Sequence, residues 1–249
     1  MRPRSRPPRP RPRRHPARVQ GSRSREGRRR REASQHRSIP ASIRKVLFRS
    51  PTKSNRMLRI LSGIYRSRRL ESPDGDDLTR PMTSRVKESV FGLLRGWFED
   101  ARVLDLFAGV GTMGLEAASL GAREVVCVER DRAVLGWLRR NIESLGCGDR
   151  VSVLVGDALA AGTLARAGGL FDVVFMDPPY ELMQEEKSLA RVLDAAARVR
   201  EVMGDRGFLV LRRPVDPNSP PPPTLEGFDG PEVHDYGKGM QVLLYCPRP

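Results

Sequence analysis

The sequence lacks the features that mark several large classes of protein. No stretch approaches 18 consecutive apolar residues, so we expect no membrane span, and the N-terminus has no apolar segment of the secretory type. The three cysteines form no CxxC pair, and their odd number argues against a disulfide framework. The three histidines are scattered, which argues against a zinc site. We therefore expect a soluble, cytoplasmic, metal-free protein, and we expect it to act as a monomer.

Acidic side chains are almost missing from the first 56 residues. This segment holds 20 Lys and Arg against two acidic residues, whereas residues 57–249 hold 25 basic and 28 acidic residues. Arg, Pro and Ser dominate residues 1–37, so we expect a disordered tail over 1–56. Three interpretations stay open. The tail binds nucleic-acid phosphates, it is a transit peptide to an organelle, or translation starts at Met57 and the tail is not native.

Residues 57–249 have the composition of an ordinary globular domain. Short apolar runs around Ser62-Gly63 predict a β-hairpin over 58–70. Apolar residues at helical spacing predict an amphipathic helix over 83–98, capped by Thr83 or Ser84. These elements form an N-terminal part, 57–100, ahead of a core over 101–249.

Strands and helices alternate strictly in the core. The apolar runs predict strands over 103–107, 124–129, 151–155, 171–176 and 208–212, and helices over 112–120, 133–145, 159–166 and 183–202. A proline-rich loop after Pro214 is expected to be extended and exposed, and 232–236 with 241–246 predict a closing antiparallel hairpin. This order is typical of an α/β fold with a mostly parallel sheet covered on both faces.

A glycine loop follows the first core strand. Gly109, Gly111 and Gly114 let the backbone turn sharply beside a ligand. Glu129 ends the next strand, where a carboxylate can accept both ribose hydroxyls of a nucleotide cofactor. The pattern also fits an NAD-dependent oxidoreductase. However, Asp105, Glu129 and Asp157 put acidic residues at the ends of three successive strands. This favours a cationic cofactor, S-adenosylmethionine, over a pyrophosphate.

The segment Asp177-Pro178-Pro179-Tyr180 follows the fourth core strand, at the same edge of the sheet. An exocyclic amine of a nucleobase is a poor nucleophile, because its lone pair is delocalised into the ring. The Asp177 carboxylate and the Pro178 carbonyl can accept its two hydrogens, and the paired prolines fix the direction of the backbone. Tyr180 offers a face on which an extruded base can stack. The segment therefore predicts an amino-methyltransferase.

At these residues the chain resembles a known family. Four segments are similar to the motifs of the nucleic-acid amino-methyltransferases: DLFAGVGTMGLEA, VVCVERD, GDAL and MDPPY. Two segments ahead of these motifs narrow the resemblance to the bacterial 16S ribosomal RNA guanine-N2 methyltransferases of the guanine-966 type: LRILSGIYRSRRL, followed by RPMTSRVKESVFGLL. The resemblance implies a class I, Rossmann-like methyltransferase fold with a mostly parallel seven-stranded sheet.

The resemblance also implies roles for single residues. It implies that S-adenosylmethionine contacts residues of the first three core strands and their loops: Asp105, Phe107, Gly109, Gly111, Glu129 and Asp157. It implies that Asp177, Pro178, Pro179 and Tyr180 hold the guanine. The entrance for cofactor and RNA would be covered by Arg80, Thr83, Arg85 and Glu88, and the hairpin would contact RNA phosphates through Arg59, Arg66, Arg68 and Arg69. The expected partner is 16S rRNA or an assembling small subunit.

Three other functions stay open from the sequence. An adenine-N6 methyltransferase is the nearest, since the same four residues serve any exocyclic amine; the DNA enzymes usually need a target-recognition domain, for which this chain has no room. A non-enzymatic RNA-binding protein would depend on the tail and bind no S-adenosylmethionine. An NAD oxidoreductase leaves Asp177–Tyr180 unexplained.

Overall fold

The structure is a computed structural model that describes residues 58–73, 84–237 and 239–249. The tail predicted over 1–56 lies outside the described residues, as do Arg80 and Thr83. No helix of the described part is long and apolar enough to cross a membrane.

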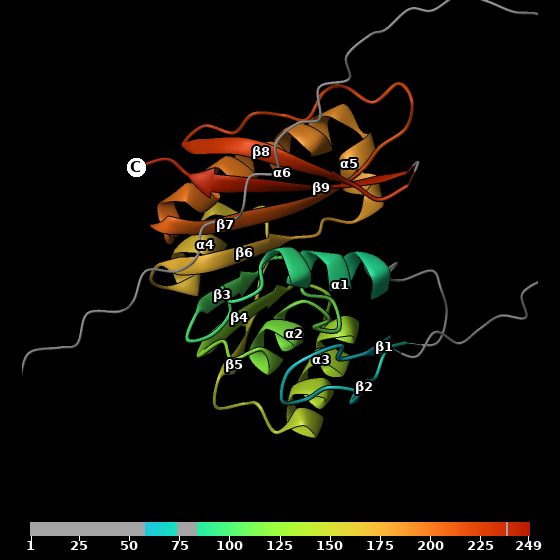
Figure 1. The fold of residues 1–249 in the computed structure, drawn as a ribbon, viewed down its shortest axis with the longest axis vertical. Coiled ribbons are helices and arrows are strands. Elements are labelled where there is room, and N and C mark those ends of the chain that lie inside the picture. Colours follow the sequence, from blue (N-terminus) through green and yellow to red (C-terminus); the bar gives the residue numbers. More distant parts are fainter. Residues whose placement is uncertain (1–57, 74–83, 238) are drawn as a thin grey trace, which may run out of the picture. The chain divides into compact units, whose positions relative to one another are not determined.

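Within the described residues, seven strands form the central sheet in the order β5-β4-β3-β6-β7-β9-β8 (Figure 1). The strands are β3 (Arg102–Asp105), β4 (Glu124–Glu129), β5 (Val151–Val155), β6 (Phe171–Met176), β7 (Met203–Pro214), β8 (Phe228–Asp235) and β9 (Met240–Pro247). Neighbours from β5 to β7 pair in parallel, and β9 pairs antiparallel with both β7 and β8. The sheet predicted from the sequence is confirmed.

Helices cover both faces of this sheet. They are α1 (Ser84–Leu93), α2 (Gly114–Ser119), α3 (Arg132–Leu145), α4 (Ala161–Ala167), α5 (Tyr180–Gln184), α6 (Glu186–Arg198) and the 3-10 helix η2 (Val199–Val202). One apolar cluster joins α1, α2 and α3 to one face, and a second joins α4, α6 and η2 to the other. The central strands are buried on both faces, which explains why their sequences are unbroken apolar runs.

Sequence and structure differ at two helices. The helix predicted over 83–98 ends at Leu93, because Gly96 adopts a left-handed conformation (φ +86°) that an α-helix cannot contain. The single helix predicted over 183–202 is wrong. The chain already turns helical at Tyr180 and breaks at Glu185, whose backbone is extended (φ −84°, ψ 128°) and whose carboxylate accepts a hydrogen bond from the Ser188 hydroxyl. A short α5 and a longer α6 result.

The predicted N-terminal hairpin is present as two very short strands, β1 (Leu58–Arg59) and β2 (Arg69–Leu70), with Leu58 paired to Leu70. Its turn packs on α2. The Ile64 N–H donates to the Ser119 carbonyl at 2.9 Å, and a Cβ on Gly63 (φ +78°) would lie 1.9 Å from that oxygen. Glycine is therefore required at position 63.

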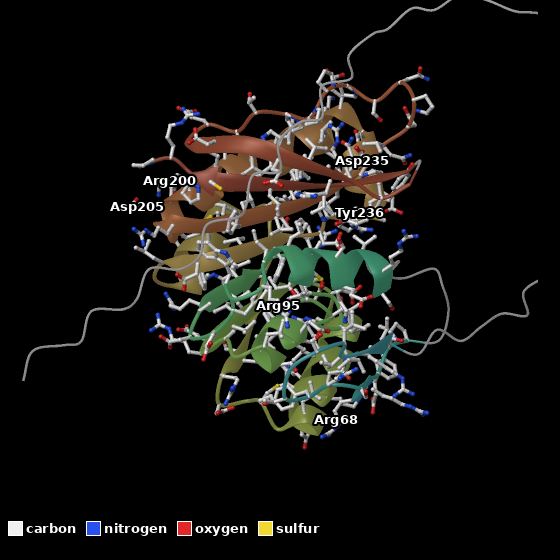
Figure 2. The ribbon with its side chains drawn as sticks, in the orientation of Figure 1. Arg68, Arg95, Arg200, Asp205, Asp235 and Tyr236 are labelled. Atoms are coloured by element: carbon white, nitrogen blue, oxygen red, sulfur yellow. The ribbon has the colours of Figure 1, made fainter. Side chains whose placement is uncertain are left out.

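The proline-rich segment has no regular secondary structure, as expected, but it is anchored to the sheet. Arg213, buried in β7, donates hydrogen bonds to the carbonyls of Pro220 and Pro221, and the Tyr245 hydroxyl donates to Pro223 at 2.8 Å. The turn of the β8–β9 hairpin meets α1, where the Tyr236 hydroxyl donates to Ser89 Oγ at 2.7 Å (Figure 2).

Candidate active site

The site lies where the direction of the strand order reverses. β3 has β4 on one side and β6 on the other, so the chain leaves β3 and β6 toward opposite halves of the sheet. Ligands of open α/β sheets bind beside the carboxyl ends of the strands at such a point. Asp105 is the last residue of β3, and Asp177 directly follows β6. The two carboxyls predicted for cofactor and substrate are therefore brought together.

The glycine loop between β3 and α2 is held by these acidic side chains. The Gly109 N–H donates to Glu129 at 2.9 Å, and the Gly114 N–H donates to Asp105 at the same distance. Gly111 (φ +93°) packs against α3, and a Cβ there would lie 2.7 Å from Leu138. The loop thus needs glycine for its conformation and for close packing.

Asp105 is a buried carboxyl with one oxygen left open. Oδ2 accepts the hydrogen bond from Gly114, while Oδ1 has no hydrogen-bond partner among the described residues. The pKa of Asp105 is raised to about 7, chiefly by burial; the hydrogen bond from Gly114 opposes the rise, and the nearby Asp177 and Glu129 carboxylates add to it. A cation placed at Oδ1 would stabilise the charged form of this group.

Glu129 and Asp157 lie on the same half of the sheet edge as the glycine loop: Glu129 is the last residue of β4, and Asp157 follows β5. Three backbone N–H groups donate to Glu129, from Gly109, Arg130 and Asp131. A carboxylate has about four acceptor positions, so room remains for about one ribose hydroxyl rather than the two expected. The Leu159 N–H donates to Asp157 Oδ1, and Asp157 Oδ2 lies 3.9 Å from guanidinium nitrogens of Arg130 and Arg191.

These residues fit S-adenosylmethionine. Asp105 offers an unpartnered buried oxygen to a cation, and Glu129 retains an acceptor position for a hydroxyl. The loop offers a glycine, Gly109, beside which a Cβ would meet no atom within 4 Å. Phe107, half-buried, comes from the same loop. In the part of the chain that is described, no group of three or more His, Cys, Asp or Glu side chains is placed to hold a metal ion.

The segment Asp177–Tyr180 joins β6 to α5. Pro178 is buried, Pro179 is exposed, and Tyr180 begins α5 with 54% of its side chain exposed. Asp177 is 15% exposed, and its carboxylate forms an ion pair with Arg212 of β7. The pKa of Asp177 is raised, because the effect of burial exceeds that of the charge and the hydrogen bond of Arg212, which lower it. Sequence reasoning missed Arg212, although a charged residue near the end of a buried strand is a detectable signal.

A second missed pair connects the N-terminal part to α2. Lys87 Nζ lies 2.9 Å from Glu116 Oε2, and the two side chains are 5% and 0% exposed. Lys87 also donates to the Arg59 carbonyl, and Glu116 accepts the backbone N–H groups of Leu61 and Ser62. The pair therefore joins α1, the hairpin and the helix that follows the glycine loop.

Asn141 of α3 forms a similar link. Its amide accepts the Glu71 N–H at 2.7 Å and donates to the Val110 carbonyl of the glycine loop at 2.9 Å. Because Asn141 is fully buried, both bonds are shielded from water. The segment that follows the hairpin is thereby fixed against the cofactor loop.

The predicted RNA-contacting arginines divide into two groups. Arg59 donates to the Ser67 carbonyl and Arg68 to the Ser144 carbonyl, so both stabilise the fold. Arg66 and Arg69 are exposed and form no ion pair with a described residue. Arg85 and Glu88 are exposed on α1.

A comparison with protein families decides the relationship. The family model described as "Conserved hypothetical protein 95" matches residues 58–242, which include the hairpin, the glycine loop and Asp177–Tyr180. The chain belongs to this family. The same range includes every element of the site, and relatives named as rRNA methyltransferases confirm the rRNA methyltransferase family that the sequence predicts.

Curated relatives and a solved structure agree with this family. "Putative rRNA methyltransferase YlbH" of Bacillus subtilis is 34% identical over 154 residues, which are 61% of this chain and 80% of that protein. "Ribosomal RNA small subunit methyltransferase D" of Escherichia coli is 40% identical over 134 residues, 53% of this chain and 66% of that protein. A structure titled "Putative methyltransferase yhhF from Escherichia coli" superposes with a TM-score of 0.63 at 30% identity, and the match covers 77% of this chain and 98% of that one. The fold is therefore that of the class I methyltransferases.

Proposed function

We propose that the chain transfers a methyl group from S-adenosylmethionine to the exocyclic N2 amine of a guanine in 16S ribosomal RNA, at the guanine-966 type of site. The observation that carries the proposal is the proximity of two groups. These are the glycine loop with its open Asp105 oxygen, and the buried Asp177 with the rigid Pro178-Pro179 turn. The names of the relatives, which are rRNA methyltransferases, support RNA as the substrate.

Each residue has a chemical task in this proposal. S-adenosylmethionine, when bound, supplies an electrophilic methyl group on a sulfonium sulfur. Asp105 would bind the cationic amino-acid part of the cofactor, Glu129 a ribose hydroxyl and Asp157 the adenine amine. These contacts are made by side chains that the backbone already orients.

On the substrate side, the amine would donate one hydrogen to the Asp177 carboxylate and one to the Pro178 carbonyl. This turns its lone pair toward the methyl group, and transfer is direct and in line. The C–N bond would form as the bond from the methyl carbon to sulfur breaks, with its electron pair left on the sulfur as a thioether, and the methylated amine would then lose its extra proton to the Asp177 carboxylate or to water. Removal of a proton beforehand is not required, because the amine becomes acidic only once it is methylated. Extruding the guanine from its stack in the RNA costs a few kcal/mol. The exposed ring of Tyr180 would offset part of this cost by stacking on the extruded base.

The test uses the full chain, labelled S-adenosylmethionine and small ribosomal subunits that lack the modification. The RNA is digested and its nucleosides are identified by mass spectrometry. We expect N2-methylguanosine. Labelled N6-methyladenosine would show that the target is the adenine amine instead. If no nucleoside carries the label although the cofactor binds, this RNA is not the substrate.

A further inference from the structure

Arg212 is the residue of the candidate site whose role the proposed function leaves open. It lies near the end of β7, the strand that pairs with β6, and its neighbour Leu211 is in register with Met176. Its Nε donates to Asp177 Oδ1, and the Arg212 side chain is 17% exposed. The pair is therefore largely shielded from solvent, where a charge-assisted hydrogen bond is strong.

The charges that face Asp177 come from two strands. β7 contributes the Arg212 guanidinium, and β3 contributes the Asp105 carboxyl. Asp105 has no ion-pair partner among the described residues and accepts a hydrogen bond from a backbone N–H alone. Among the described residues, two carboxyls thus share a site with one cation, Arg212, and this cation contacts Asp177.

We propose that Arg212 is a positioning residue that holds Asp177 as an anion, with Oδ1 occupied and Oδ2 directed to the incoming amine. A protonated Asp177 would present an O–H donor to an amine that needs acceptors, and it would leave the lone pair of that amine unaligned. Arg212 prevents this by stabilising the charged form of Asp177 in preference to that of Asp105. The planar guanidinium also fixes the plane of the carboxylate, which a lysine does less well.

The expected effect of Arg212 on kcat rests on the proposed function, whereas its expected effect on the titration of Asp177 does not. The test therefore has two readouts on the full chain. The first is the chemical shift of the Asp177 carboxyl carbon, measured by NMR as pH is raised from acid to neutral. The protein carries carbon-13 at its aspartates and contains no cofactor, and the Asp177 signal is the one that is absent in Asp177→Asn. The second is the pH profile of kcat for methyl transfer.

Three variants are compared with the unmodified chain. Arg212→Gln removes the charge, Arg212→Lys keeps it, and Arg213→Gln removes the neighbouring arginine. Arg213 contacts Gln241, Pro220 and Pro221 on the other side of β7, so it controls for the loss of a buried arginine from that strand. Thermal unfolding of all three checks that they are folded.

In Arg212→Gln we expect the Asp177 resonance to titrate at higher pH, the acid limb of kcat to move in the same direction, and kcat at neutral pH to fall about 10- to 100-fold. Arg212→Lys should restore the titration and part of kcat, and Arg213→Gln should change neither. An Asp177 titration that is the same in Arg212→Gln and the unmodified chain overturns the inference, whatever the activity. A moved titration in a chain that methylates no RNA overturns the proposed function and leaves the role of Arg212 in charging Asp177 in place.

Discussion

The two halves of the carboxyl edge of the sheet are held in different ways. On the glycine-loop half, Asp105, Glu129 and Asp157 accept hydrogen bonds from backbone N–H groups. On the other half, Asp177 is held by the side chain of Arg212, 35 residues away in the chain. Backbone N–H groups remain when side chains change, whereas a side-chain pair is lost with either member. In the proposed function the glycine-loop half binds the cofactor and the Asp177 half binds the substrate; we call them the cofactor half and the substrate half. The substrate half should therefore be more sensitive to single substitutions than the cofactor half.

The comparison is tested most directly at Asp177. Asp177→Ala removes an acceptor of the amine, and we expect methyl transfer to fall by about 10²- to 10⁴-fold. Cofactor affinity should hardly change, because no backbone contact of the glycine loop involves this residue. Labelled-methyl incorporation and calorimetry with S-adenosylmethionine measure the two effects separately. Full activity of Asp177→Ala would remove the proposed role.

The pair of Lys87 and Glu116 tests whether the N-terminal part depends on side chains too. Lys87→Met leaves the buried Glu116 charge without its cation, and breaking one member of a buried pair costs about 3–5 kcal/mol. Urea unfolding measures the loss. Arg140→Gln is the control: it removes a pair with Glu71 that is about half exposed and should cost about 0–1 kcal/mol. Equal effects of the two substitutions would show that the buried pair does not stabilise the fold.

The order of the elements could be predicted from the sequence because it depends on local patterns. The predicted and observed bounds agree at 124–129, 151–155 and 171–176, where each strand is a short apolar run; 124–129 and 171–176 are buried on both faces, whereas 151–155 forms an edge of the sheet and is partly exposed. The carboxylates of the glycine-loop half follow from the same patterns, since each ends or follows a strand and contacts N–H groups nearby in the chain. The break at Glu185 was missed because apolar spacing continues across it.

The pairs that join distant segments could not be predicted in this way. Arg212 and Asp177 belong to different strands, and which strands are neighbours is set by the whole sheet. Lys87 did carry a signal, since it lies three residues before Val90 on the apolar face of α1. A charged residue at such a position requires a buried partner, but the sequence does not say that the partner is Glu116.

On the glycine-loop half, Asp105 should make the stability of the fold depend on pH. Its folded-state pKa, about 7, lies above the ordinary value of 3.8, so the folded chain keeps a proton that the unfolded chain releases. The protonated form contributes stability that is complete below pH 4. This stability is lost as pH rises to 7, by roughly 4 kcal/mol. Asp105→Asn keeps an acceptor for the Gly114 N–H without the charge. We expect this variant without cofactor to gain stability over the unmodified chain across this range, as measured by urea unfolding at pH 4, 5.5, 7 and 8. A constant difference would show that Asp105 ionises normally.

Glu129→Gln tests how far the backbone contacts protect the cofactor half. Loss of charge-assisted hydrogen bonds at about 1.5–3 kcal/mol should weaken S-adenosylmethionine binding by about 10- to 100-fold and leave kcat at saturating cofactor nearly unchanged. Glu124→Gln, at the other end of β4 and paired with Arg102, serves as the control and should bind the cofactor normally. A fall in kcat as large as that of Asp177→Ala would contradict the division into two halves.

The smallest effect is expected at the hairpin, outside both halves. Arg66 and Arg69 are exposed and free of ion pairs with described residues, so they are available for phosphates, whereas Arg59 and Arg68 are engaged by carbonyls of the fold. Arg66→Gln and Arg69→Gln should each weaken RNA binding a few-fold and lower the slope of log affinity against log salt by about 0.7–0.9. Binding titrations between 50 and 200 mM salt measure the slope, and Arg206→Gln, an exposed arginine of β7, is the control. If all three variants have the same slope, Arg66 and Arg69 make no phosphate contact.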